Sequence, residues 1–174
     1  SYTYLWFHQI QELMNKQLSV VIPAYNESNT ILDILQKVYG LEIPGIDLEI
    51  IVINDCSTDD TRSLVEKFIS DHPDRPVQLL DQEKNQGKGA AIHRGIKEAR
   101  GDYLVIQDAD LEYDPEEYRD LLKPVLIGQA DVVYGSRFMG DKPHRILFFW
   151  HSIGNKMLTT LSNMFTNLNL TDME

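Results

Sequence analysis

The chain has 174 residues, the length of one ordinary globular domain, and its hydrophobic content of 43% is sufficient for a single core. Its formal net charge of −11 argues against a general nucleic-acid-binding protein, because such a protein needs a basic face to neutralise phosphates. The single cysteine, Cys56, excludes an internal disulfide and favours a reducing, cytoplasmic environment.

Predicted strands and helices alternate along the chain. Short apolar runs predict five strands, at residues 18–23, 49–53, 77–80, 103–106 and 131–135. Helical spacing and capping signals predict helices over residues 27–40, after a capping box at 57–60, over 87–100, after the Asp-Pro-Glu-Glu start at 114–117, and from about 143 to 167. This order predicts an α/β fold, with a Rossmann-like, mostly parallel sheet covered by helices on both faces.

The apolar pattern of the sequence predicts neither a membrane-spanning helix nor a signal peptide. No apolar run approaches the roughly 18 residues that a membrane-spanning helix needs, and the first residues do not have the pattern of a signal peptide. We expect residues 1–17 to be an N-terminal extension and residues 18–174 to form one domain. The chain has no initiator methionine and stops abruptly, so we expect a fragment truncated at its C-terminal end.

Polar residues follow the first two predicted strands, where ligands of parallel sheets bind. Tyr25 and Glu27 follow the first strand and offer a nucleobase an aromatic face and an acceptor carboxylate. Asp55 follows the second strand, where a carboxylate could bind a base or a ribose. The alternative is that both segments are simple turns that lead into helices.

Asp108 and Asp110 follow the fourth predicted strand. Because side chains alternate in a strand, we expect both carboxylates on one face, where they repel unless a cation lies between them. Such oxygen ligands suit Mg²⁺ or Mn²⁺, and Glu112 continues the same spacing. Lys88, at the start of a predicted helix, could meet a phosphate. A solvated acidic turn is the alternative for the aspartates.

A basic cluster late in the chain could bind an anionic group of a substrate; its members include Arg137, Arg145, His151 and Asn155. The alternative is that these are surface side chains that balance acidic neighbours. The apolar run at 146–150 is suited to core packing or, alternatively, to contact with a membrane.

Taken together, these segments resemble glycosyltransferase family 2, and within it the dolichol-phosphate mannosyltransferase-like enzymes that act on polyprenyl phosphates. Five motifs in order carry the resemblance: VVIPAYNE at 20–27, EIIVINDCSTDDT at 49–61, NQGKGAAIHRGIKEARGDYLVIQDADLEYDP at 85–115, YGSRF at 134–138 and HRILFFWHSIGN at 144–155. The chain departs from the family pattern at Asn54, which replaces an aspartate, and at Cys56, which replaces a glycine. If that turn needs a positive φ, Cys56 is strained there.

The resemblance implies an A-type glycosyltransferase (GT-A) fold over residues 18–174 and a role for each site residue. Pro23, Tyr25, Glu27 and Asp55 would bind the base and ribose of a nucleotide sugar, and Lys88 would lie near this donor. Asp108 and Asp110, with Glu112, would hold the divalent cation and the diphosphate. The acceptor phosphate would be oriented by Arg137, Arg145, His151 and Asn155.

The expected activity is an inverting transfer of a sugar from a UDP- or GDP-sugar to a polyprenyl or dolichyl phosphate, at the cytoplasmic face of a membrane that the protein contacts peripherally. Because a phosphate monoester has a second pKa of about 6, the acceptor is already largely ionised at neutral pH, and we expect no essential protein base. Two alternatives stay open: transfer to a sugar hydroxyl in polysaccharide synthesis, and nucleotide-sugar binding without catalysis.

Overall fold

The computed structural model describes residues 16–133 together with residues 160, 162 and 164. The chain divides into two compact units, Ser1–Glu117 and Tyr118–Glu174. The first contains the sheet and the helices that cover it, and the second contains α5 (Tyr118–Leu126). Of the helix expected over 143–167, only residues 160, 162 and 164 are described, and all three are helical. Among the described residues, no helix combines the length and the apolar character that crossing a bilayer requires.

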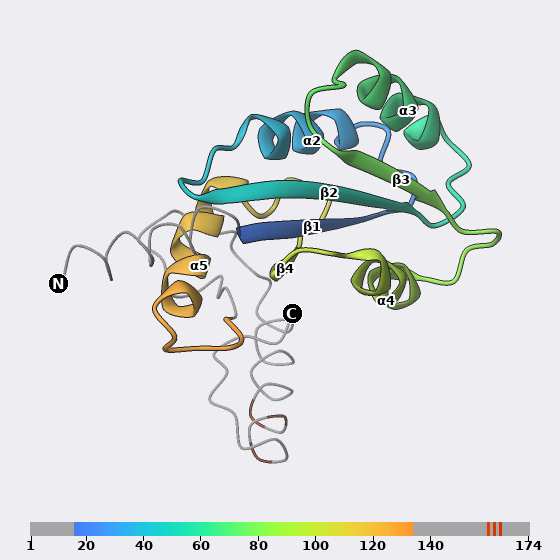
Figure 1. The fold of residues 1–174 in the computed structure, drawn as a ribbon. Coiled ribbons are helices and arrows are strands. Elements are labelled where there is room, and N and C mark those ends of the chain that lie inside the picture. The colour runs from blue at the N-terminus through green and yellow to red at the C-terminus, as the bar shows by residue number, and fades with distance from the viewer. Residues whose placement is uncertain (1–15, 134–159, 161, 163, 165–174) are drawn as a thin grey trace, which may run out of the picture. The chain divides into compact units, whose positions relative to one another are not determined.

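Four parallel strands form the sheet, in the order β3-β2-β1-β4 (Figure 1). They are β1 (Lys16–Ala24), β2 (Ile46–Asn54), β3 (Val77–Asp81) and β4 (Tyr103–Ile106). The chain steps outward from β1 to β3 and then returns to the other side of β1 to form β4. Between β1 and β4 the strand order therefore reverses, and ligands of such sheets bind outside the carboxyl ends of the strands at this point.

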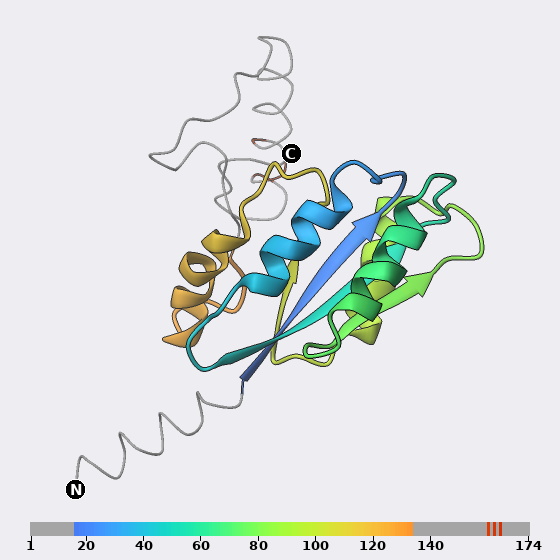
Figure 2. The same cartoon turned by 90° about the horizontal axis from the view of Figure 1, so that it is seen from above.

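Helices cover both faces of the sheet, as the sequence predicts. In Figures 1 and 2, α2 (Ile31–Gly40) and α3 (Thr61–Asp71) lie on one face, and α4 (Lys88–Glu98) lies on the other. Because β1 and β2 are covered on both sides, their central residues are buried in an unbroken apolar run.

α4 packs very closely against β1 because its buried face carries Ala91 and Gly95. A Cβ atom on Gly95 would collide with Cγ1 of Val21 and would lie 3.2 Å from its Cγ2. Val21 is fully buried in the core. The small residues on α4 thus bring its backbone against the sheet and fix the position of its first turn.

The turn between α4 and β4 is anchored at the amino ends of the strands. The carboxylate of Glu49 accepts hydrogen bonds from the Ser19 hydroxyl at 2.6 Å and from the Arg100 N–H at 3.1 Å, while the Gly101 N–H donates to the Ser19 hydroxyl at 2.9 Å. A Cβ atom on Gly101 would lie 2.7 Å from the Gln17 carbonyl oxygen, so only glycine fits. Glu49 and Ser19 therefore lock β4 in register beside β1.

Three local predictions were wrong. The second element, α2, begins at Ile31 rather than Glu27, because residues 27–30 form a turn in which the Glu27 carbonyl accepts the N–H groups of Thr30 and Ile31. Ser57 does not cap α3, which begins at Thr61, because its hydroxyl accepts the N–H of Asn26 from the neighbouring loop.

The third wrong prediction is the strand at 131–135. Residues 131–133 form no strand, and residues 134–135 lie outside the described residues. The helix start at Asp114 is confirmed, because its carboxylate accepts the Glu116 N–H at 3.2 Å. The first turn, Pro115–Glu117, is 3₁₀ rather than α-helical.

Candidate active site

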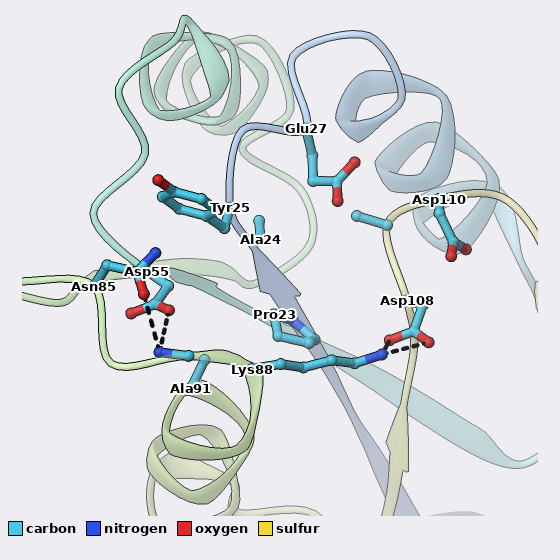
Figure 3. A pocket seen from close by; sticks show the side chains of 12 residues that line it. Pro23, Ala24, Tyr25, Glu27, Asp55, Asn85, Lys88, Ala91, Asp108 and Asp110 are labelled. Carbon is cyan, nitrogen blue, oxygen red and sulfur yellow. Dashed lines mark hydrogen bonds and ion pairs between the residues drawn. The ribbon is translucent and has the colours of Figure 1, made fainter. Parts of the chain in front are cut away.

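A pocket of about 430 Å³ opens at the carboxyl ends of β1, β2 and β4, beside the first turn of α4 (Figure 3). This volume is in the range of small-molecule sites. The pocket lies at the point where the strand order reverses. Its lining consists of Pro23, Ala24, Tyr25, Glu27, Asp55, Asn85, Gly87, Lys88, Ala91, Asp108, Ala109 and Asp110. Seven of the predicted site residues therefore share one cavity.

The segment after β1 presents Tyr25 and Glu27 to the pocket because it is tied to the neighbouring loop. Asn26 adopts a left-handed conformation, with φ of 57°, which asparagine tolerates better than most residues. Its side-chain oxygen accepts the N–H of Thr58 at 2.8 Å. The Glu27 N–H donates to the Thr61 hydroxyl at 2.8 Å. Tyr25 is left 47% exposed, with its ring free to stack on a flat ligand.

Asp59 reinforces this junction and was not identified from the sequence as a positioning residue. Its carboxylate accepts the Ser28 N–H at 3.1 Å and both the N–H and the hydroxyl of Thr61. Burial opposes the charged form of Asp59, but these hydrogen bonds outweigh it and lower the pKa to about 2. Asp59 is therefore ionised at neutral pH and joins the loops that follow β1 and β2.

Asp55 is almost fully buried and holds the loop that leads into α4. Its Oδ1 accepts hydrogen bonds from the Gln82 side chain and the Gln86 N–H, both at 2.8 Å, and its Oδ2 accepts the Gly87 N–H at 2.7 Å. A carboxylate has about four acceptor positions, so one remains on Oδ2 for a ligand. The predicted contact with a base or ribose stays a prediction, and beside it Asp55 has a positioning role that the sequence did not indicate.

Cys56 adopts a left-handed backbone conformation, with φ of 59°, as expected if this turn needs a positive φ. A non-glycine residue is strained in this region, and such strain gathers at functional sites. Asn54 precedes it and is buried; its amide donates to Asp81 at 2.7 Å, and its oxygen accepts the Ser57 N–H at 3.1 Å. An aspartate at position 54 would place two carboxylates in contact, which explains the amide.

Asp108 and Asp110 both line the pocket, but not for the reason that the sequence suggested. β4 ends at Ile106, so the two aspartates lie in a turn and not on a strand. The turn is held by the buried Gln107, whose side-chain amide donates to the carbonyl oxygens of Asp108 at 3.0 Å and Tyr113 at 3.2 Å. Gln107 is thus a further positioning residue that the sequence analysis missed.

The two carboxylates have different immediate partners. Nζ of Lys88 lies 2.8 Å from both oxygens of Asp108. Oδ1 of Asp110 accepts the Glu112 N–H at 3.0 Å, across Leu111, whose φ is 63°. Glu112 is not among the pocket-lining residues, and its role as a metal ligand stays a prediction.

The chemistry of the donor set fits a divalent cation. Asp108 and Asp110 supply hard carboxylate oxygens in one pocket, as Mg²⁺ and Mn²⁺ prefer. Within the described part of the chain, no group of three or more His, Cys, Asp or Glu side chains could enclose a metal. A cation at this site would therefore need oxygens from a ligand or from water, as Mg²⁺ sites that bind phosphates do.

The predicted acceptor residues lie outside the described residues; they are Arg137, Arg145, His151 and Asn155. The apolar run at 146–150, a candidate for membrane contact, lies outside them as well. Their roles stay predictions.

Comparison with known proteins agrees with the geometry of this site. Residues 19–171 match the family model described as glycosyl transferase family 2. A dolichol-phosphate mannosyltransferase of Pyrococcus furiosus is 33% identical, over 71% of this chain and 34% of its own length. A dolichyl-phosphate beta-glucosyltransferase of Trichomonas vaginalis is 37% identical, over 67% of this chain and 37% of its own length. The chain thus spans about a third of these relatives.

Among solved structures, the chain resembles a mannosyltransferase of Pyrobaculum calidifontis in complex with GDP-Man and Mn²⁺. The TM-score is 0.51 and the identity 27%, over 62% of this chain and 34% of the other. With the sheet order, this similarity confirms the predicted GT-A fold. The chain belongs to glycosyl transferase family 2.

Proposed function

We propose that this chain carries the donor site of a metal-dependent glycosyltransferase that moves a sugar from a UDP- or GDP-sugar to a polyprenyl phosphate, with inversion at the anomeric carbon. The observation that carries the proposal is one pocket, at the reversal of the strand order, that joins an exposed aromatic ring to a pair of aspartates. Such a pocket offers a nucleotide sugar one contact for its base and another for its diphosphate.

The residues around the base have complementary tasks. The exposed ring of Tyr25 provides a face on which a base can stack, and Glu27 lies beside it in the pocket (Figure 3). The remaining acceptor position of Asp55 suits a ribose hydroxyl or a base N–H. The hydrogen bonds of Asn26 and Asp59 hold the backbone on either side of Glu27 in place before the ligand binds, which reduces the ordering needed on binding.

The residues around the diphosphate are charged. Asp108 and Asp110 would hold Mg²⁺ or Mn²⁺, and the ammonium of Lys88, which lines the same pocket, would pair with a phosphate. When bound, the cation would neutralise the charge that develops on the leaving diphosphate. Attack from the opposite side of the sugar inverts the anomeric centre, so an α-linked donor gives a β-linked product.

A lipid phosphate is the acceptor that best fits the two relatives, whose names specify dolichol-phosphate and dolichyl-phosphate transferases. Its phosphate is already largely ionised at neutral pH, so orientation by Arg137 and Arg145 replaces a protein base in this proposal. Loss of turnover with intact donor binding, on replacing one acidic residue other than Asp108 and Asp110, would refute the absence of an essential base.

The test is a turnover assay on the protein with UDP- and GDP-sugars, Mn²⁺ or Mg²⁺, and either a short polyprenyl phosphate or a sugar acceptor. We expect metal-dependent release of nucleoside diphosphate with the lipid phosphate. Asp108→Asn should abolish release, whereas Asp47→Asn, the same charge change on an exposed residue of β2, should not. Turnover only with the sugar acceptor would replace the lipid-phosphate proposal by polysaccharide synthesis. Metal-independent donor binding without turnover would indicate a binding module.

A further inference from the structure

Lys88, the first residue of α4, extends its side chain beside Pro23 to Asp108 (Figure 3). Its Nζ lies 2.8 Å from each of the two carboxylate oxygens. The pair is partly in solvent, since the side chain of Lys88 is 61% exposed and that of Asp108 is 22% exposed. Exposed ion pairs contribute little to stability, so this contact can be exchanged for another without loss of the fold.

The ammonium of Lys88 and a divalent cation compete for the same carboxylate. Both oxygens of Asp108 already face Nζ. A magnesium ion binds a carboxylate oxygen at about 2.1 Å, which would bring a double positive charge beside the ammonium. The repulsion between them favours either the ion pair or the coordinated cation, but not both.

The rest of the site is held by contacts that do not involve this ion pair. Asp110 accepts a backbone N–H from its own turn, independently of Lys88. The backbone before Lys88 is held by Asp55, which binds the N–H groups of Gln86 and Gly87. Only the flexible four-carbon side chain of Lys88 has to move.

We propose that Lys88 is an exchangeable counter-ion that couples the binding of the cation to the binding of the donor. Its ammonium holds Asp108 before the donor binds, and it passes to the donor's diphosphate when Asp108 takes up the cation. This inference rests on the proposed function and adds a positioning role for one residue. Because binding couplings are reciprocal, the cation binds more tightly when a nucleotide is present, and the nucleotide more tightly when the cation is present.

The experiment compares the protein with Lys88→Met and with Lys97→Met, an equal charge change on an exposed residue of the same helix. Calorimetry measures the affinity for Mn²⁺ alone, and then for UDP and GDP at saturating Mn²⁺. For Lys88→Met we expect Mn²⁺ alone to bind up to about fivefold more tightly, the range set by an exposed ion pair. We expect the nucleotide to bind at least about tenfold more weakly, as for a lost charged hydrogen bond.

Lys97→Met should match the wild type in both titrations, and Lys88→Arg, which keeps the charge, should not bind Mn²⁺ more tightly. Equal or weaker binding of Mn²⁺ alone by Lys88→Met would overturn the inference. Failure of the proposed function would look different: the wild type would then bind neither UDP nor GDP at saturating Mn²⁺, whatever the residue at position 88.

Discussion

Replacing Gly95 by alanine tests the close packing of α4 on β1, which fixes the position of the first turn of α4. The new methyl group would collide with Val21, which is fully buried. Val21 is β-branched, so it has little rotamer freedom with which to move aside. The helix must therefore shift away from the sheet, and its first turn, which carries Lys88, must shift with it.

The expected magnitude follows from two opposing effects. Alanine raises the intrinsic stability of a helix by about 1 kcal/mol relative to glycine. Overpacking of a core costs about 1–3 kcal/mol, and the upper part of this range applies because Val21 cannot rotate away. We therefore expect Gly95→Ala to lower the free energy of unfolding by about 1–2 kcal/mol. In a protein of this length that corresponds to a fall in Tm of roughly 2–8 °C.

Gly89→Ala is the matched control, because it makes the same change in the same helix. No atom lies within 4 Å of the Cβ that it would add, so we expect a gain of up to about 1 kcal/mol from helix propensity alone. Urea unfolding followed by circular dichroism measures both variants. Equal stabilities for Gly95→Ala and Gly89→Ala would refute the close packing of α4 on the sheet.

Further predictions concern the carboxylates. We expect Asp108→Asn and Asp110→Asn each to reduce metal-dependent turnover by at least about a hundredfold, while the thermal melting temperature changes by only a few degrees. Turnover near the wild-type rate in either variant would show that the replaced aspartate is not part of the site. Asp55→Asn should lower the free energy of unfolding by about 1–3 kcal/mol in urea titrations, because the amide that replaces Oδ2 faces the Gly87 N–H and the charged hydrogen bond between them is lost; a neutral effect would contradict the positioning role of Asp55. The pKa of Asp59 is lowered from 3.8 to about 2, so its ionised form stabilises the folded protein above pH 3.8, and this contribution is lost as the pH falls towards 2. Unfolding titrations of wild type and Asp59→Ala should therefore differ by a constant amount above about pH 5 and converge in acid, and a difference that persists at pH 2 would show that the charge is not involved.

Four of the five predicted strands and the general place of the site could be predicted from the sequence, because these depend on local patterns. The apolar runs around Val21 and Ile51 predict buried parallel strands, and both are in the core of the sheet. Once strands and helices alternate, the residues that follow the strands must meet at one edge of the sheet. That is why Tyr25, Asp55 and Asp108 could be assigned to one pocket in advance.

The interactions that hold the site could not be predicted, because they join residues far apart in the sequence. Ser57 has the local pattern of a helix cap, yet its hydroxyl binds the N–H of Asn26. Asp55 has the position of a ligand-binding carboxylate, yet three protein donors already occupy most of its acceptor positions. The alternation of side chains in a strand was expected to place Asp108 and Asp110 on one face, whereas both lie beyond the end of β4, in a segment held by Gln107.

The central claim is that Asp108 and Asp110 bind a divalent cation in the pocket that also receives a nucleotide. A crystal of the protein grown with Mn²⁺ and UDP or GDP tests it most directly. The anomalous scattering of manganese locates the ion in anomalous difference maps. We predict one peak within coordination distance of both carboxylates, with the nucleotide's diphosphate beside it and its base against Tyr25. Manganese bound elsewhere, or a nucleotide bound outside this pocket, would contradict the account.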